Sequence, residues 1–343
     1  MTDQLYSFRK VGVCGSSKGL SKRASELCQA IGRRLARESN LAIVSGGTKK
    51  RSSATGRDNF AAEWFVVSAA EAMIQPDRVD DRIITVAKDD DDETNARFKI
   101  GSTKRARGRT SEARRISFVL DLHALIAIGG NDGTRQELAL ALEFKIPILP
   151  VPGFGNAAQE VWDAYRTDLI KLLRIDDERA RRWEQAAVDE SVEIQPFVDE
   201  MIGALLASLP KRCFVIMPFH KNFDALYDLI IEPAIRAAGD EPIRVDRVAV
   251  PGNVTMQVEN GLKACDYVIA VLDGMRPNVL YELGAAHAHG KPAILLNGED
   301  GLAEPVPFDI YTQQRYQFSH LDAEFLARLT QMISTVSGSR RGS

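Results

Sequence analysis

Short apolar runs that end in small residues alternate with amphipathic stretches, and this alternation constrains the fold more than any other feature. VGVCGSS (11–17) has the pattern of a strand that runs into a turn, and residues 21–39 follow with a serine start and apolar positions at helical spacing. The same pattern predicts further strands at 41–48, 82–88, 123–130 and 146–153. Repeated strand–helix units place parallel strands in one sheet with helices on both faces. The first half is therefore predicted to be a doubly wound α/β domain.

The same order restarts after residue 210. RCFVIMPF (212–219) reads as a strand and residues 223–239 as the helix after it. Further strands are predicted at 242–248, 267–273 and 292–298, with helices at 254–265 and 278–290. The chain is thus predicted to form two Rossmann-like or flavodoxin-like domains with parallel sheets.

Four segments describe the predicted domain organisation. They are a nucleotide-binding domain at 1–180, a helical connector at 181–209, a second domain at 210–336 and a disordered tail at 337–343. A length of 343 residues suits two domains of ordinary size.

Composition narrows the class of protein. A net charge of −3 gives no general attraction to nucleic acid or to an acidic membrane. No apolar run approaches the ~18–20 residues that cross a bilayer. The four cysteines are far apart, with no metal-ligand spacing, so we expect reduced thiols, a cytoplasmic location and no metal site.

Two stretches have biased charge. The acidic run at 89–93 is expected to be a solvated loop. The basic stretch at 99–115 is expected to be a mobile surface loop or, alternatively, a rim that attracts phosphate. It contains no interleaved aromatic residues, which makes a nucleic-acid platform the weakest interpretation.

Three turns of small residues follow predicted strands of the first half, at 14–21, 45–48 and 129–137. Ligands of open parallel sheets bind beyond the carboxyl ends of the strands, where glycines let backbone N–H groups approach a phosphate. The turns therefore predict a pocket for a nucleotide or sugar phosphate. Its candidate residues are Gly15, Ser16, Ser17, Gly46, Gly47, Thr48, Gly129, Gly130, Gly133 and Thr134.

The last of these turns carries a family resemblance. GGNDGTRQE (129–137) resembles the PGGxGTxxE motif of the SLOG superfamily, which includes the lonely guy phosphoribohydrolases and DprA. The resemblance implies a functional glutamate at Glu137 and an arginine on the preceding helix, at Arg114 or Arg115. Ile128 replaces the motif's proline, and the turn is one residue longer. The second glycine motif of the hydrolases is not reproduced, which favours nucleotide binding over hydrolysis.

In the second half, a glutamate lies among small apolar residues in PNVLYELGAAHAHGKP (277–292). Asp273 ends the predicted strand before it, and Asn278 and Glu282 lie one helical turn apart on one face. A carboxylate in the crevice can stabilise an oxocarbenium-like transition state or act as a nucleophile, while a second polar group holds ribose hydroxyls. His287 and His289 are expected to have structural or surface roles.

Residues 211–298 resemble the nucleoside 2-deoxyribosyltransferase-like and TIR-like group, in CFVIMPF and in the YELGAAHAHGKP string. The resemblance implies that Glu282 is catalytic, with Asp273 and Asn278 near the ribose. It also implies substrate contacts from Met217, Phe219 and Tyr281. Arg276 departs from the transferase pattern, which favours cleavage of an N-glycosidic bond in NAD or a nucleotide over deoxyribosyl transfer. In a purely structural alternative, Glu282 binds an arginine such as Arg244.

Together these features predict a sensor joined to an effector. The first domain would bind a nucleotide-derived signal, and the second would hydrolyse NAD or a related nucleotide, as in bacterial anti-phage defence proteins. The resemblance also implies a homo-oligomer. Two alternatives stay open: a phosphoribohydrolase that acts on nucleoside monophosphates through Glu137 and Arg114 or Arg115, and a non-enzymatic scaffold that binds nucleotides in both pockets.

Overall fold

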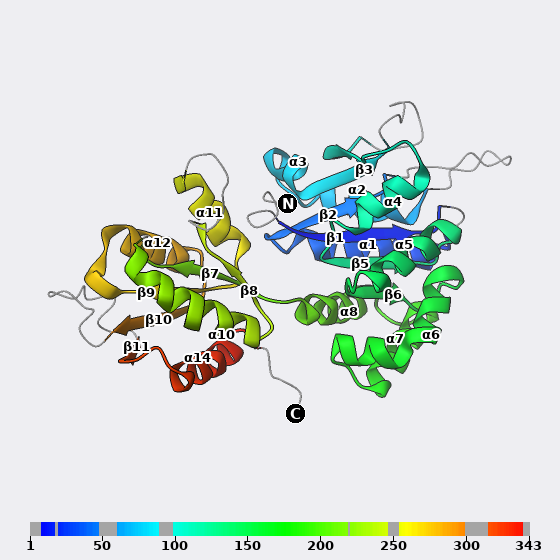
Figure 1. The fold of residues 1–343 in the computed structure, drawn as a ribbon. Helices are drawn as coiled ribbons and strands as arrows, with labels where there is room; N and C mark the ends of the chain where they lie inside the picture. Colours follow the sequence, from blue (N-terminus) through cyan, green and yellow to red (C-terminus); the bar gives the residue numbers. More distant parts are fainter. Residues whose placement is uncertain are drawn as a thin grey trace. The chain divides into compact units, whose positions relative to one another are not determined.

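The chain forms two compact α/β units in the computed structural model, residues 8–209 and the described part of 210–343 (Figure 1). The structure describes residues 8–17, 20–47, 60–88, 99–218, 220–245, 254–298 and 315–338. Each unit contains a sheet of parallel strands only, flanked by helices. The predicted fold class is confirmed.

The sheet of the first unit has six strands in the order β4-β3-β2-β1-β5-β6. Its strands are β1 (Arg9–Gly15), β2 (Leu41–Ser45), β3 (Ile83–Ala87), β4 (Ser102–Arg105), β5 (Ala124–Ile128) and β6 (Ile148–Val151). Strand β1 lies at the centre, paired with β2 on one side and with β5 on the other. The chain therefore builds the sheet outward from β1 in one direction and then in the other.

Helices lie between these strands and after the last of them. They are α1 (Lys22–Ala36), α2 (Ala62–Glu71), α3 (Val79–Arg82), α4 (Ser111–Val119), α5 (Asp132–Glu143), α6 (Asn156–Leu173), α7 (Asp177–Val188) and α8 (Ile194–Ser208). The side chain of Ser21 caps α1 by accepting a hydrogen bond from the backbone N–H of Ala24. Thr110 caps α4 in the same way. These caps satisfy backbone donors that a helix start leaves unpaired.

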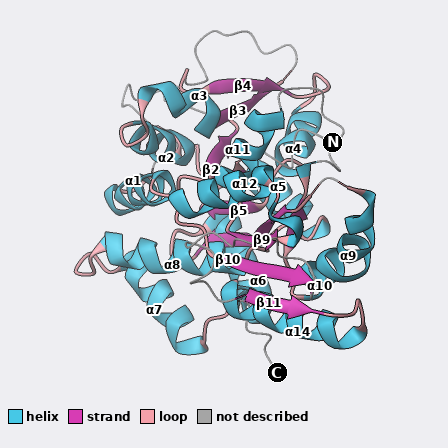
Figure 2. Ribbon diagram, turned by 90° about the vertical axis from the view of Figure 1, so that its left-hand side faces the viewer, coloured by secondary structure: helices cyan, strands magenta, loops and turns pink. Residues whose placement is uncertain are grey.

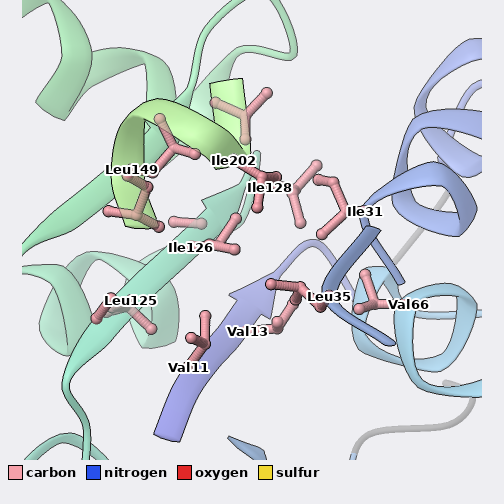
Figure 3. Packing of buried hydrophobic residues seen from close by; sticks show 14 of the residues in the cluster. Val11, Val13, Ile31, Leu35, Val66, Leu125, Ile126, Ile128, Leu149 and Ile202 are labelled. Carbon is pink, nitrogen blue, oxygen red and sulfur yellow. The ribbon is translucent and has the colours of Figure 1, made fainter. Parts of the chain in front are cut away.

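The core of the first unit packs helices against the faces of the central strands. Figure 3 shows Val11 and Val13 of β1 beside residues of β5, with Ile31 and Leu35 of α1 near Val66 of α2. All five of these side chains are fully buried. The central strands carry almost continuous apolar runs because both of their faces are covered.

Two stretches of the first unit differ from their sequence-based interpretation. Residues 181–209, interpreted as a connector, lie within the first unit, and α8 contributes Met201 and Ile202 to its core. The basic stretch 99–115 is not simply a loop, because it contains the edge strand β4 and the first turns of α4. Strand β4 pairs with β3 although its own side chains are largely exposed.

The sheet of the second unit has five strands in the order β11-β10-β9-β7-β8. They are β7 (Arg212–Ile216), β8 (Glu241–Ile243), β9 (Tyr267–Val271), β10 (Ala293–Gly298) and β11 (Arg315–Phe318). Figure 2 shows β9, β10 and β11 side by side. Counted from the first strand of this unit, the order is the 2-1-3-4-5 arrangement of flavodoxin-like domains.

Both faces of this second sheet are covered. The helical segments are α9 (Asp224–Leu226), the π-helical turn η4 (Tyr227–Ile231), α10 (Glu232–Ala237), α11 (Val254–Ala264), α12 (Pro277–Ala288) and α14 (Ala323–Val336). One core cluster joins α10 and α14 to the sheet, and another joins α11 and α12 to it. Strand β11 and helix α14 were not assigned from the sequence.

All four cysteines are buried free thiols. In the described ranges, the helices are too short or too polar to cross a membrane. The acidic run at 89–93 and the tail from residue 339 lie outside the described residues.

Candidate functional site

The order of the strands in the first unit reverses between β1 and β5, and a ligand crevice is expected beyond the ends of these strands. Strand β1 pairs with β5 so that Gly15 is opposite Ile128, and both strands end at the same edge of the sheet. The next strands in sequence extend the sheet away from this point on either side. Such a switch point is the usual ligand position in doubly wound folds. The first and third glycine turns therefore meet there.

Backbone geometry at this edge requires glycine. Gly129 and Gly130 have φ angles of +59° and +90°, in the region that side chains disfavour. A Cβ atom on Gly15 would lie 2.4 Å from the carbonyl oxygen of Ile128. The hydroxyl of Thr134 reaches back to the carbonyl of Gly15 at 3.4 Å. The turns after β1 and β5 are thus packed directly against each other.

A buried ion pair lies at the crevice. Nη2 of Arg114, on α4, lies 2.7 Å from Oε1 of Glu137, on α5. The two side chains are only 14% and 7% exposed. Burial raises the pKa of Glu137, and the charge of Arg114 opposes that rise. The sequence resemblance implied a functional arginine at Arg114 or Arg115, and of these two it is Arg114 that forms an ion pair with Glu137.

Arg115 has a different environment. Its Nη1 atom lies 3.6 Å from Oε1 of the exposed Glu112. Its Nε atom is buried and has no hydrogen-bond partner among the described residues. A Cβ atom added to Gly133, in the first turn of α5, would lie 3.5 Å from Nη2 of Arg115. Arg115 therefore lies beside the start of α5, and its positive charge also lowers the pKa of Glu137.

Sequence reasoning missed a second carboxylate, Glu63. It lies in the first turn of α2 and is 8% exposed. The Cβ position of Gly46, just after β2, is 2.6 Å from Nη1 of Arg114 and 3.5 Å from Oε1 of Glu63. Burial raises the pKa of the Cys14 thiol, and the charges of Glu137 and Glu63 raise it further. A carboxylate in the apolar context FAAEWFVV was a signal that could have found Glu63.

The other residues predicted for this pocket follow the ends of β1 and β2. Ser16 donates its backbone N–H to the carbonyl of Ile128 at 2.9 Å, and the half-buried Ser17 follows it. Gly47 has a φ of +76° and donates its N–H to the hydroxyl of Ser45. Thr48 lies outside the described residues.

The order of the strands in the second unit reverses between β7 and β9, and a ligand crevice is expected beyond the ends of these strands. Asp273 follows β9, and its carboxylate oxygens accept the backbone N–H of Gly298 at 3.1 and 3.2 Å. Burial raises the pKa of Asp273, and the hydrogen bond from Gly298 opposes that rise. Asp273 thus ties the end of β9 to the end of β10.

Glu282 is buried on α12, at 7% exposure, on the same helix face as Val279, Leu283 and Ala286. Asn278, one turn earlier, is exposed, as are His287 and His289. Tyr281 is 70% exposed.

Met217 and Phe219 were also predicted to contact substrate. Met217 is fully buried in the core cluster of this unit. Phe219 lies outside the described residues. Arg244, named in the structural alternative, stacks 4.5 Å from the ring centroid of Tyr227 and pairs with Asp224 at 3.3 Å.

The remaining features indicate no further chemistry. A groove of about 970 Å³ lies between α5 and α6, but none of the crevice residues lines it. Its walls are mainly apolar, including Leu142, Val161 and Leu169. Within the described ranges, His, Cys, Asp and Glu side chains form no group of three that could hold a metal ion.

Comparisons with known proteins gave distant structural likenesses. No family model and no curated protein matches the sequence. The solved structure of the protein TM1055 is 19% identical over 46% of this chain and 81% of its own, with a TM-score of 0.35. The molybdenum cofactor binding protein from Rippkaea orientalis is 19% identical over 41% of this chain and 74% of its own, with a TM-score of 0.33. DNA processing protein A from Helicobacter pylori is 14% identical over 59% and 84%, with a TM-score of 0.35. Similarity at this level says nothing about ligand or activity.

Proposed function

We propose that the chain is a nucleotide-responsive enzyme. Its first unit would bind a phosphorylated nucleotide, and its second unit would cleave the N-glycosidic bond of NAD or a related nucleotide. The observation that carries the cleavage proposal is the burial of Glu282 on the helix that begins at the switch point of the second sheet. A carboxylate held in a desolvated crevice is suited to charge that develops at an anomeric carbon.

In this reaction the bond between C1′ of the ribose and the nicotinamide nitrogen breaks, and its electron pair leaves with the base. The carboxylate of Glu282 would stabilise the positive charge that develops on C1′. Water then adds hydroxide to C1′ and releases one proton. Asn278, one turn earlier on α12, would hold a ribose hydroxyl. Asp273 would fix the neighbouring strand ends through Gly298.

Ligand binding is proposed for the first unit because glycine turns with positive φ angles and two largely buried arginines, Arg114 and Arg115, lie near the switch point of its sheet. Guanidinium groups and the N-terminus of α5 both favour anions. A hydrolase gated by such a ligand would suit anti-phage defence, with self-association of the chain as the activating step.

The test is NAD consumption by the purified full-length protein, with and without cyclic nucleotides and ADP-ribose. The wild type is compared with Glu282→Gln and with Glu259→Gln, an exposed control on α11. We expect NAD loss in the wild type and in the control, and none in Glu282→Gln. NAD loss that survives in Glu282→Gln would overturn the assignment of Glu282.

A second candidate is a phosphoribohydrolase at the first crevice, favoured by the buried ion pair of Arg114 with Glu137. Base release from nucleoside monophosphates, compared between Glu137→Gln and Glu282→Gln, separates the two enzymes. Loss of release in Glu137→Gln alone supports this second candidate. If no variant and no wild-type sample releases base while nucleotides still bind, the chain is a binding protein.

A further inference from the structure

The groove between α5 and α6 is lined by a stripe of residues from each helix. The residues of these stripes are Arg135, Ala139 and Leu142 on α5, and Val161, Tyr165, Asp168 and Leu172 on α6. Steps of three or four positions place each stripe on one face of its helix. Helix faces with this apolar spacing are normally covered by another packed element. The groove, of about 970 Å³, has the shape and lining of a helix-packing surface.

A different face of α6 is already occupied by α7. The rings of Trp162 and Trp183 pack with centroids 6.3 Å apart, and the indole N–H of Trp162 donates to Oε1 of Glu184 at 2.8 Å. Nε of Arg166 donates to the same oxygen at 3.1 Å. Helix α6 is therefore fixed in its rotation by α7, and the face that carries Tyr165 is held toward the groove.

Two aromatic side chains at the groove are exposed. Tyr165 is 43% exposed, and Phe144, between the lining residues Glu143 and Lys145, is 47% exposed. The backbone of α6 also leaves helical geometry at Tyr165, with a φ of −115° and a ψ of 16°. Exposed aromatic rings of this kind are enriched at protein interfaces, where one ring removes a large apolar surface from water.

The charges on the groove select its occupant. Glu143, Lys145 and Asp168 line it and form no ion pair with the described residues. A small anion would be repelled by the two carboxylates, and a small cation by Lys145. A surface that carries both signs can pair with a copy of itself, because a two-fold axis places each residue of one copy opposite its counterpart's neighbours. The charges of the groove are therefore complementary to those of the same groove in a second copy.

We propose that this groove is the interface between two copies of the chain. In the dimer, the α5 and α6 faces of one copy pack on those of the other, which buries Tyr165 and brings Lys145 of each copy near a carboxylate of the other. The interface supplies the self-association in the proposed function, and it rests on that function only for its role in activation. Its existence is tested without NAD or a nucleotide.

Sedimentation velocity over a range of concentrations measures self-association of the full-length protein, and we expect the wild type to form a dimer. Tyr165→Glu places a charge in the buried face and should raise the dissociation constant at least about tenfold, as the loss of an interface anchor does. Val188→Glu is the matched control, because Val188 is 60% exposed on α7 and does not line the groove. This control should dimerise as the wild type does.

Lys145→Glu tests the charge pairing. It leaves like charges facing each other across the axis and should also weaken the dimer, whereas Lys145→Arg should dimerise as the wild type does. Circular dichroism checks that each variant is folded. A folded Tyr165→Glu or Lys145→Glu variant that dimerises as tightly as the wild type would overturn the interface, and so would a wild type that stays monomeric at every concentration.

NAD consumption by the same samples separates the interface from the proposed function. If the dimer dissociates in both variants while no sample, the wild type included, consumes NAD, the interface stands and the NAD function is overturned. If the dissociated variants consume NAD as fast as the wild type, the interface stands and its role in activation is overturned.

Discussion

Arg114 and Glu137 form an ion pair of 2.7 Å with both side chains largely buried, at the edge of the sheet where β1 and β5 end. The two residues come from different helices and lie 23 positions apart. Each side chain places a charge where there is little water, and the opposite charge of its partner offsets the cost of that desolvation. The stability of the first unit and the shape of its crevice therefore depend on the same contact.

Replacing Arg114 should be costly. Arg114→Met leaves the carboxylate of Glu137 buried without its counter-charge, and we expect the free energy of unfolding at pH 7 to fall by about 3 kcal/mol. Urea denaturation measures it. Arg135→Met, which removes the exposed ion pair with Glu160, is the matched control and should have a much smaller effect. Equal losses in the two variants would contradict the buried character of the Arg114 pair.

The pH dependence of stability should carry a signature of Glu137. Burial raises its folded-state pKa above the ordinary 4.5, so the folded protein binds this proton more readily than the unfolded chain. The contribution of Glu137 to stability is then largest below pH 4.5 and decreases as pH rises through the folded pKa. The free energy of unfolding of the wild type relative to that of Glu137→Gln should therefore decrease as the pH is raised from 4 to 8. A difference that stays constant with pH would refute this.

Asp121 should behave in the opposite way. Burial alone would raise its pKa, but hydrogen bonds from Lys10 and Lys104, both at 2.9 Å, lower it below its ordinary 3.8. Its stabilising effect is present above pH 3.8 and is lost as pH falls through the lowered pKa. Asp121→Asn should destabilise the protein at pH 7 and make acid unfolding below pH 4 less steep. If acid unfolding of Asp121→Asn is as steep as that of the wild type, Asp121 does not contribute to the pH dependence of stability.

The contact between α1 and α2 depends on Gly32. A Cβ atom there would lie 2.1 Å from the carbonyl oxygen of Val66, which is backbone and cannot move independently. Gly32→Ala should therefore lower the melting temperature, with a loss of about 1–3 kcal/mol. Gly203→Ala, in α8 with open space at its Cβ, should raise stability by about 0.5–1 kcal/mol. Calorimetry measures the stability of both variants, and we expect Gly32→Ala to be less stable and Gly203→Ala more stable than the wild type.

Local patterns along the chain were sufficient to predict the fold class and most of the elements. The buried strands β2 and β5 are nearly uninterrupted apolar runs, and β1 has an apolar centre after Arg9 and Lys10. The helices carry apolar residues at helical spacing. Strand β4 was not predicted from the sequence, because Ser102–Arg105 is an exposed edge strand with polar residues. Only its pairing with β3 makes it a strand, and that pairing is invisible in a local window.

The candidate site was predictable where its signal is local and not where it depends on distant residues. The glycine turns and Glu137 follow from one motif. The choice between Arg114 and Arg115 depends on how α4 is turned against α5, which neighbouring residues on one helix do not reveal. Glu63 comes near Gly46 and Arg114 only through the packing of distant parts of the chain, because all three residues are far apart in the sequence. The resemblance in CFVIMPF placed Met217 near the substrate, and the structure shows its side chain fully buried in the core.

The hydrogen bond from Thr134 to Gly15 joins residues that are 119 positions apart. During translation, β1, α1 and β2 therefore leave the ribosome long before β5 has been made. Until β5 and α5 are made, the central strand has an unpaired edge exposed to the cell. Non-local pairing of this kind folds slowly. During its synthesis, the growing chain has an aggregation-prone interval that ends only when the crevice itself is assembled.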